Sequence, residues 1–279
     1  MPKYFSKVQT MAEKGVSFFL IGIFLPIILF GCAAKEPILK KQAQAIQLDN
    51  KGAEYFQEGQ YQKALVHFQK ALQTYESIDH REGVARTLNN LGTVYQATDQ
   101  CTQALVFFQR ALTINSEIGQ EEGLSLNLNN IGSATLSLGR PQAALEFFQK
   151  SLSFEEKRGN IRGQAIRWNN LGRTYRNLGQ DDRALECYLK AKTLNEKADH
   201  LIGIADNLNN MGALYEARKD WPRALEAFQG LWNWTGKKKT PRASQPIWLI
   251  WEGCMRPWES RRKRWIIICA PGGSMNRWA

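Results

Sequence analysis

Apolar residues along most of this chain recur at intervals of three, four and seven positions, the spacing that places side chains on one face of an α-helix. One such stripe, in the segment 83–96, consists of Leu88, Leu91 and Tyr95. A second stripe, in the segment 101–118, consists of Ala104, Phe108, Ala111 and Leu112. The pattern therefore predicts a pair of amphipathic helices.

The same pattern recurs every 40 residues. Its most regular part reads LDNKG at 48–52, LNNLG at 88–92, LNNIG at 128–132, WNNLG at 168–172 and LNNMG at 208–212. An alanine and an aromatic residue follow each of these segments in constant register, as Ala64 and Phe68, Ala104 and Phe108, Ala144 and Phe148, Ala184 and Tyr188, and Ala224 and Phe228. A fixed period of this length indicates a repeat protein in which each unit is one helix pair.

Small residues at the glycine and alanine positions allow the two helices of a unit to cross closely, because the ridges of one helix then fit the grooves of the other. Neither helix can bury its apolar stripe alone, whereas stacked units bury a continuous core. We therefore predict an all-α protein of five stacked antiparallel helix pairs.

The order apolar, x, x, Leu, Gly, x, x, Tyr, followed by alanine, an aromatic residue and alanine, resembles the tetratricopeptide repeat over residues 42–229. The usual repeat of that family has about 34 residues. The period of 40 found here is similar to the long repeats of kinesin light chain. This resemblance implies a right-handed α-solenoid with a concave groove.

In such a fold the first helix of each pair lines the groove, so the repeated asparagines become candidate binding residues. Asparagine is less favourable than alanine inside a helix, and its repetition indicates a role. The second asparagine of each doublet lies on the side of its helix away from the Leu88 and Leu91 stripe. These candidate peptide-binding residues are Asn50, Asn90, Asn130, Asn170 and Asn210.

Two roles remain open for these asparagines. A carboxamide offers both a donor and an acceptor, which can pair with the backbone of an extended peptide, and the family resemblance supports that role. Alternatively, one asparagine of each doublet bonds neighbouring helix turns and only stabilises stacking. The second role is favoured for the first asparagines, Asn89, Asn129, Asn169 and Asn209.

The charge of the predicted groove indicates which peptide it favours. Related repeats that clamp a terminal carboxylate surround such an asparagine with lysine or arginine. This chain instead has Asp49, Ala53, Thr93, Ser133 and Ala213 at groove positions, and its basic candidates are Arg86, Arg173 and Arg176. We expect no carboxylate clamp. A weakly basic groove favours an extended polar or acidic peptide, unless these arginines are simply solvated.

Residues 1–31 have the composition of an export signal. Lys3, Lys7 and Lys14 precede an apolar run at 15–31 that contains no charge and leads to Cys32. The LFGC stretch resembles a bacterial lipobox, which implies that Cys32 is lipidated. The expected product is an exported lipoprotein, at the outer membrane or cell surface of a Gram-negative cell, with a linker at 32–41. An ordinary signal peptide or an uncleaved anchor helix is the alternative, although a bilayer span needs ~20 residues.

The sequence contains no pattern that indicates catalysis. The motifs GxSxG, HExxH and GxxxxGK[ST] are absent, and His67, His80 and His200 have no matching partners. The cysteines Cys101, Cys187, Cys254 and Cys269 lack the spacing of a metal site. We expect no catalytic residue, no metal and no cofactor. Free thiols are expected, although an exported protein could pair Cys101 with Cys187.

The net charge of +11 belongs mainly to the two ends of the chain, because residues 32–229 are nearly neutral. A nucleic-acid partner is therefore not expected, since phosphate binding needs a basic face on the folded body.

The repeat pattern stops after Gln229, and residues 230–279 contain seven of the nine tryptophans. Regrouping each codon as the last base of its predecessor plus its own first two bases turns every tryptophan into leucine, methionine or valine. The segment 248–252 then permits LANLG, 40 residues after LNNMG. We interpret the tail as a sixth repeat read out of frame and expect it not to fold. A tail of aromatic and basic residues at a membrane interface is the alternative.

Two functions follow from these observations. The favoured one is a membrane-anchored, non-enzymatic scaffold that binds an extended peptide or protein partner in the groove of the solenoid. The other is the regulatory part of a longer enzyme or signalling protein, because similar repeat arrays often precede a further domain, sometimes a caspase-like protease.

Overall fold

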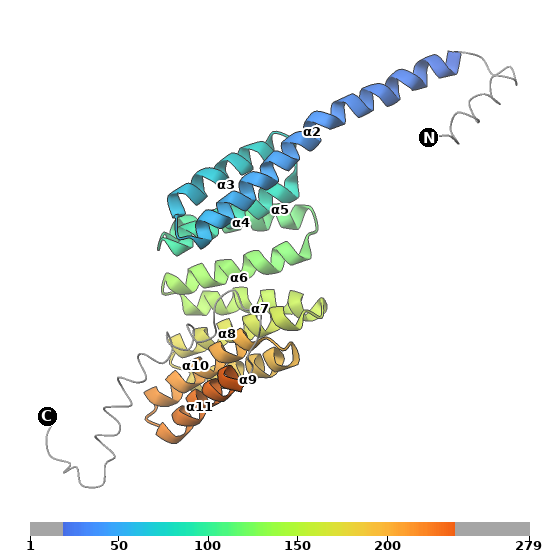
Figure 1. Ribbon diagram of the computed structural model, residues 1–279. Coiled ribbons are helices and arrows are strands. Elements are labelled where there is room, and N and C mark those ends of the chain that lie inside the picture. Colours follow the sequence, from blue (N-terminus) through green and yellow to red (C-terminus); the bar gives the residue numbers. More distant parts are fainter. Residues whose placement is uncertain (1–18, 238–279) are drawn as a thin grey trace, which may run out of the picture. The chain divides into compact units, whose positions relative to one another are not determined.

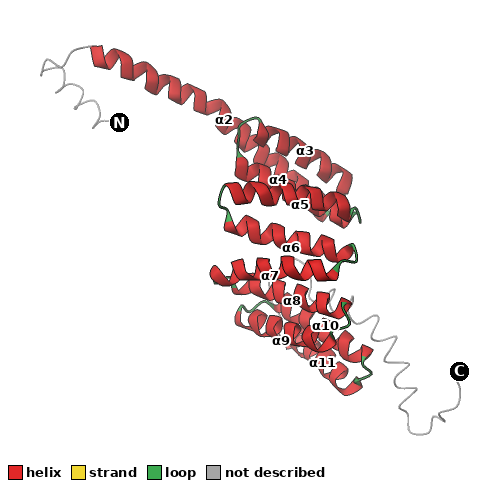
Figure 2. Cartoon of the chain, turned by 180° about the vertical axis from the view of Figure 1, so that it is seen from behind, coloured by secondary structure: helices red, strands yellow, loops and turns green. Residues whose placement is uncertain are grey.

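A computed structural model describes the backbone of residues 19–237 and the side chains of residues 37–228 and Gly230. Every element in this range is an α-helix, and short turns join the helices (Figure 2). The helices are α2 (Phe19–Gln57), α3 (Tyr61–Glu76), α4 (Arg81–Ala97), α5 (Cys101–Glu117), α6 (Glu121–Ser137), α7 (Pro141–Lys157), α8 (Ile161–Asn177), α9 (Asp181–Lys197), α10 (Leu201–Ala217) and α11 (Trp221–Lys237). The lysine-rich start of the export signal, Cys254, Cys269 and residues 238–279 of the tail lie outside the described range.

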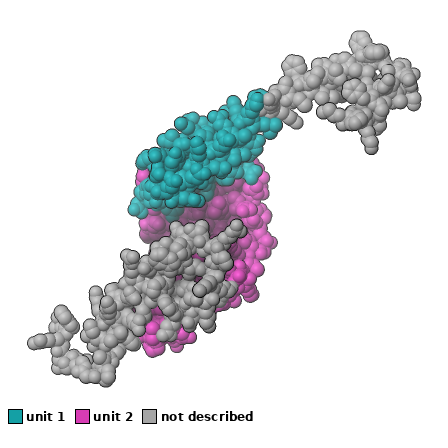
Figure 3. Space-filling view, in the orientation of Figure 1, with its two compact units in different colours: residues 1–99 teal, residues 100–279 magenta. Residues whose placement is uncertain are grey.

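The chain forms two compact units, residues 1–99 and residues 100–279 (Figure 3). In the first unit α2 packs against α3, and α3 packs against α4. In the second unit the helices from α5 to α11 lie side by side in chain order, each in contact with the next (Figure 1). The predicted all-α class and the predicted helix pairs are confirmed, with helix ends that differ by only a few residues from those expected.

Helix α2 runs without a break from Phe19 to Gln57, so the expected linker at 32–41 is helical and continues into the first repeat. No helix of the described range combines the length and the hydropathy required to cross a membrane.

In four of the repeats the recurring glycine and aromatic residue meet in the structure. The ring of Tyr188 on α9 lies against Gly172 on α8, where an added Cβ atom would be 2.6 Å from the ring. The same contact joins Phe148 to Gly132, and Phe68 to Gly52. A side chain at these positions would separate the two helices, which explains why the period preserves glycine here.

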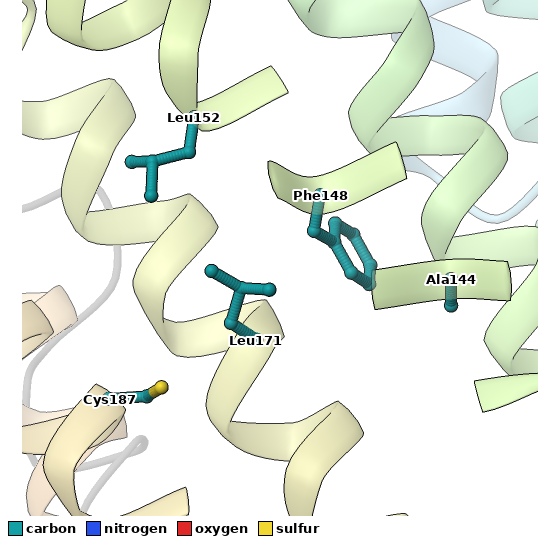
Figure 4. Close-up of a cluster of buried hydrophobic side chains, with 5 residues drawn as sticks. All are labelled: Ala144, Phe148, Leu152, Leu171 and Cys187. Carbon is teal, nitrogen blue, oxygen red and sulfur yellow. The ribbon is translucent and has the colours of Figure 1, made fainter. Parts of the chain in front are cut away.

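The apolar stripes form the core of the second unit. Figure 4 shows Leu171 of α8 between Phe148 of α7 and Cys187 of α9, and all three side chains are buried. Ala144 and Leu152 of α7 complete this cluster. Helices α7 and α9 therefore each contact the first helix of their own pair and that of the next pair, as expected for stacked repeats.

A residue with positive φ recurs every 20 positions and ends each helix in the same way. At Gly179, which follows α8, φ is +71°, and the N–H of Gln180 donates to the carbonyl oxygen of Tyr175 at 2.9 Å. This is the hydrogen bond of a Schellman turn, which favours glycine because a Cβ atom is strained in that conformation. The turns between the helices are thus nearly identical.

Candidate peptide-binding face

The exposed sides of α6, α8 and α10 form one face of the second unit, which we call the asparagine face. Four positions on each helix lie there, spaced four, three and four residues apart, and all are exposed or half-buried. They are Leu126, Asn130, Ser133 and Ser137 on α6; Ile166, Asn170, Arg173 and Asn177 on α8; and Asp206, Asn210, Ala213 and Ala217 on α10.

The asparagines of this face form a ladder between successive repeats. The Asn170 amide Nδ2 donates to Oδ1 of Asn129 at 2.8 Å, and the Asn210 Nδ2 donates to Oδ1 of Asn169 at 2.9 Å. Within α6, the Asn129 Nδ2 donates to Oδ1 of Asn130 at 3.2 Å. The doublets of α6 and α8 thus each contain an acceptor for the following repeat, so the stacking role expected of the first asparagines is present for Asn129 and Asn169.

The second asparagines keep capacity for a ligand despite this bond. A carboxamide has two N–H groups and an acceptor oxygen, and the ladder uses one N–H each of Asn170 and Asn210. Both side chains are half-buried, and their Oδ1 atoms accept no hydrogen bond from any residue of the described range. Stacking and ligand binding are therefore compatible at these positions.

The first unit contains an ionic version of the same arrangement. Asp49 occupies the place of a first asparagine, is buried, and accepts a hydrogen bond from the Thr87 hydroxyl at 3.0 Å. Burial raises the pKa of the Asp49 carboxyl, while Arg86, Thr87 and Asn90 lower it. Asn50 is exposed on α2.

The three candidate arginines differ in their surroundings. Arg86 is committed within the protein, because its Nε lies 3.2 Å from Oδ2 of Asp49 and its Nη2 donates to the Tyr75 hydroxyl at 2.7 Å. Arg173 and Arg176 are exposed on α8 and form no ion pair with any residue whose side chain is described. Positive charge available to a ligand is therefore provided by α8 in the second unit.

A buried ion pair lies at the junction of α7 and α8. The guanidinium of Arg167 is 3.3 Å from the carboxylate of Glu155, and their side chains are 7% and 3% exposed. Arg167 also donates to Ser151 Oγ at 2.9 Å and to Ser125 Oγ at 3.2 Å. Burial lowers the pKa of Arg167, and the neighbouring Glu155 partly compensates for this effect. The Glu155 carboxylate also accepts from the Asn160 amide Nδ2 at 2.6 Å and lies 3.7 Å from the Arg158 guanidinium.

The equivalent junctions on either side are neutral. Asn115 donates to Asn127 at 2.7 Å, and Asn195 donates to Asn207 at 2.8 Å. Glu155 and Arg167 occupy these two positions of the period. At each junction a glycine makes room for the polar side chain, since an added Cβ atom at Gly163 would lie within van der Waals overlap of Glu155.

The Tyr188 hydroxyl is buried without a hydrogen-bond partner in the described range. Desolvation by burial raises the pKa of Tyr188 to about 12. The equivalent residue is phenylalanine in each of the other four repeats. The packing that recurs from repeat to repeat therefore provides no partner for a hydroxyl group.

Replacing Tyr188 with phenylalanine is expected to raise the free energy of unfolding by about 1 kcal/mol, because a buried polar group without a partner is destabilising. Urea unfolding followed by circular dichroism measures the change. Phe148→Tyr places the same hydroxyl one repeat earlier and is expected to lower the stability by a similar amount. Equal stability of Tyr188→Phe and the wild type would show that the hydroxyl finds a partner in solution.

Cys101, Cys187 and His80 have structural roles. Cys101 and Cys187 are buried and unpaired, so the disulfide considered from the sequence is not present. Burial raises the pKa of the Cys187 thiol to about 11. Nδ1 of His80 accepts from the N–H of Gly83 at 2.9 Å and caps α4. No cluster of potential metal ligands occurs among the described residues.

The asparagine face also contains two residues that the sequence analysis did not select. Leu126 and Ile166 are 43% and 42% exposed, although both are large and apolar. Each lies four residues before a ladder asparagine and therefore on the same side of the helix. The spacing is visible in the sequence, but the exposure of the two side chains is not.

The tetratricopeptide repeat sequence profiles match residues 43–117 and 164–229, and a second profile of the same description matches residues 128–157. The first profile alone covers half of the chain. Comparison with curated protein sequences gives no match.

Several solved structures share this fold. The crystal structure of BtubC (BKLC) from P. vanneervenii is 21% identical, with a TM-score of 0.64 over 77% of this chain and 89% of that one. A putative kinesin light chain from Podosopora anserina with nearly identical TPR-like repeats is 16% identical, with a TM-score of 0.59 over 70% of this chain and 96% of that one.

A Rap protein complexed with Competence and Sporulation Factor is 16% identical, with a TM-score of 0.65 over 78% of this chain and 65% of that one. At these levels of identity the likeness concerns the fold. Together with the profile matches and the 40-residue helix pairs, it leads to one assignment: the chain belongs to the tetratricopeptide repeat family.

Proposed function

We propose that the protein is a non-enzymatic scaffold that binds an extended polar or acidic peptide segment of a partner across the asparagine face. The half-buried ladder asparagines carry this proposal, because they present donors and acceptors at regular intervals beside Arg173 and Arg176, which are exposed on α8. An extended peptide has backbone amides at regular intervals as well, and its hydrogen bonds must be matched when the peptide leaves water.

A structural neighbour is consistent with this proposal. The Rap protein of similar fold was crystallised with Competence and Sporulation Factor bound. We infer that a repeat array of this kind also binds a peptide in the present protein, with Asn130, Asn170 and Asn210 contacting its backbone. Asn50 and Asn90 extend the same role to the first unit.

The ladder supplies a matched test of this role. Asn170→Ala and Asn129→Ala each remove the same inter-repeat hydrogen bond, but only Asn170→Ala removes the amide that is proposed to contact the peptide. Binding to an array of labelled 12-residue peptides is expected to weaken at least about tenfold for Asn170→Ala, the effect of one to two hydrogen bonds.

Asn129→Ala is expected to bind these peptides nearly as well as the wild type, while both variants show similar thermal midpoints by circular dichroism. Equal loss of binding in the two variants would mean that the asparagines act only through stacking. The combined replacement of Asn90, Asn130, Asn170 and Asn210 by alanine should abolish binding to the array and preserve the helical signal, because alanine is the better helix former.

We further propose that lipidation of Cys32 holds the repeats at a bacterial membrane surface. The charge-free apolar run before LFGC supports this proposal. In bacteria that express the full chain, Cys32→Ala is expected to abolish labelling by an alkyne fatty acid and to shift the protein out of the membrane fraction. Cys101→Ala serves as the control. Labelling that persists in Cys32→Ala would contradict the anchor.

A further inference from the structure

One row of residues on the asparagine face takes no part in the hydrogen bonds of the ladder. Leu126, Ile166 and Asp206 occupy equivalent positions on α6, α8 and α10, each four residues before a ladder asparagine. The two aliphatic side chains are more than two-fifths exposed on consecutive repeats. Their apolar surface lies beside polar groups that we propose to bind a peptide backbone.

The carboxylate of Asp206 ends this row. It is exposed, forms no ion pair with any residue of the described range, and has the His200 ring as a neighbouring titratable group. Arg173, a charge of opposite sign on this face, lies seven residues beyond Ile166 on α8 and therefore about two helical turns away. A cation placed on the row would thus meet a carboxylate that has no ion-pair partner among the described residues.

We propose that the row of Leu126, Ile166 and Asp206 selects a peptide with two aliphatic residues followed, toward Asp206, by a lysine or arginine. This inference rests on the proposed peptide-binding function and defines its ligand further. The ladder binds the backbone, the aliphatic pair binds side chains, and Asp206 fixes the direction of the peptide. The acidic residues favoured by Arg173 and Arg176 then lie along the other edge of the same segment.

The spacing of the helices limits the spacing of these peptide residues. Packed helices lie about 8–10 Å apart, and an extended chain advances about 3.3 Å per residue. About three peptide residues therefore pass each repeat. The expected pattern is Leu-x-x-Leu-x-x-Lys or the same order reversed, according to the direction in which the peptide runs.

The test uses the full chain and fluorescein-labelled 12-residue peptides with serine at the x positions. The set contains both orders of the pattern, versions with both leucines changed to serine, and versions with lysine changed to glutamate. Fluorescence anisotropy measures each affinity. One order of the leucine peptide is expected to bind at least about tenfold more tightly than its serine version, because burial of two aliphatic side chains favours binding.

The protein variants locate the contacts. Leu126→Ser combined with Ile166→Ser should remove the preference for leucine over serine, and Asp206→Lys should change the preference from the lysine to the glutamate peptide. Both replaced apolar side chains are largely exposed, so the fold should persist. Leu189→Ser on α9, which removes an aliphatic side chain that is 44% exposed on another helix, is the matched control.

Three results would overturn this inference. The first is an unchanged preference for leucine in the double serine variant. The second is loss of a concentration-dependent dimer in that variant, seen by analytical ultracentrifugation, since a second copy of the chain would then cover the row. The third is equal affinity of wild type for leucine and serine peptides. If binding to other array peptides still depends on Asn170 in that case, the proposed function stands without this specificity.

Discussion

Arg167→Ala is expected to lower the free energy of unfolding by about 3 kcal/mol, because a buried carboxylate loses the nearer of its two cationic partners. The carboxylate of Glu155 would stay in a site where its side chain is 3% exposed, and its remaining cationic neighbour, Arg158, lies 3.7 Å away. Urea unfolding of the full chain measures the change. A loss below about 1 kcal/mol would show that water reaches the carboxylate.

The neighbouring repeats provide the compensating variant. The charged cluster consists of Ser125, Ser151, Glu155 and Arg167. At the next junction, 40 residues later, the equivalent residues are alanine, alanine, asparagine and asparagine. Replacing all four residues by those of the sibling junction builds a second Asn–Asn pair like Asn195 and Asn207. This variant is expected to return to within about 1 kcal/mol of the wild type, because a neutral pair avoids the desolvation of two charges.

The second large effect concerns the end of the array and rests on the interpretation that the tail is out of frame. A leucine recurs at one position of the period, and Leu185 packs against the cluster of Met211 and Leu214 in the following helix. Its equivalent on α11, Leu225, is 38% exposed. A further helix pair that supplies the residues of a sixth repeat would cover this position.

Inserting one base near codons 228–230 is therefore expected to add a folded repeat and to raise the thermal midpoint by about 5 °C or more, because each repeat adds an interface with its neighbour. Limited proteolysis should show a protected core longer by one helix pair. Inserting three bases at the same place keeps the present frame and is the matched control. An equal thermal midpoint of the two altered genes' products would contradict the out-of-frame interpretation.

Much of the fold was predictable because the period repeats its information. A glycine and an aromatic residue recur with fixed spacing in every repeat. The close contact that this spacing predicts is present between Gly172 and Tyr188. The helices and their pairing follow from that regularity. Interactions that depart from the period were harder to predict, since a single charged residue in one repeat gives no sign of its partner.

The candidate site was likewise predictable where it follows the period and not where it departs from it. The positions of Asn130, Asn170 and Asn210 were predictable from the sequence, but the hydrogen bonds of Asn170 and Asn210 to the preceding repeat required three-dimensional distances. Arg86 was considered as a groove residue because its exposure was inferred from helix position. Its contact with Asp49 joins residues 37 positions apart, and sequence spacing alone does not indicate such a contact.

The charged junction also bears on how a chain of near-identical units finds its correct alignment. If α7 of one molecule docked one repeat too far along, Glu155 would face Asn207 and Arg167 would face Asn115 or Asn195. Each such misalignment would bury Glu155 and Arg167 apart from each other. In a chain with asparagine at every junction, repeats of two molecules could be exchanged with little loss of stability. The pair of Glu155 and Arg167 thus favours one alignment of the repeats and disfavours intermolecular exchange of repeats during folding.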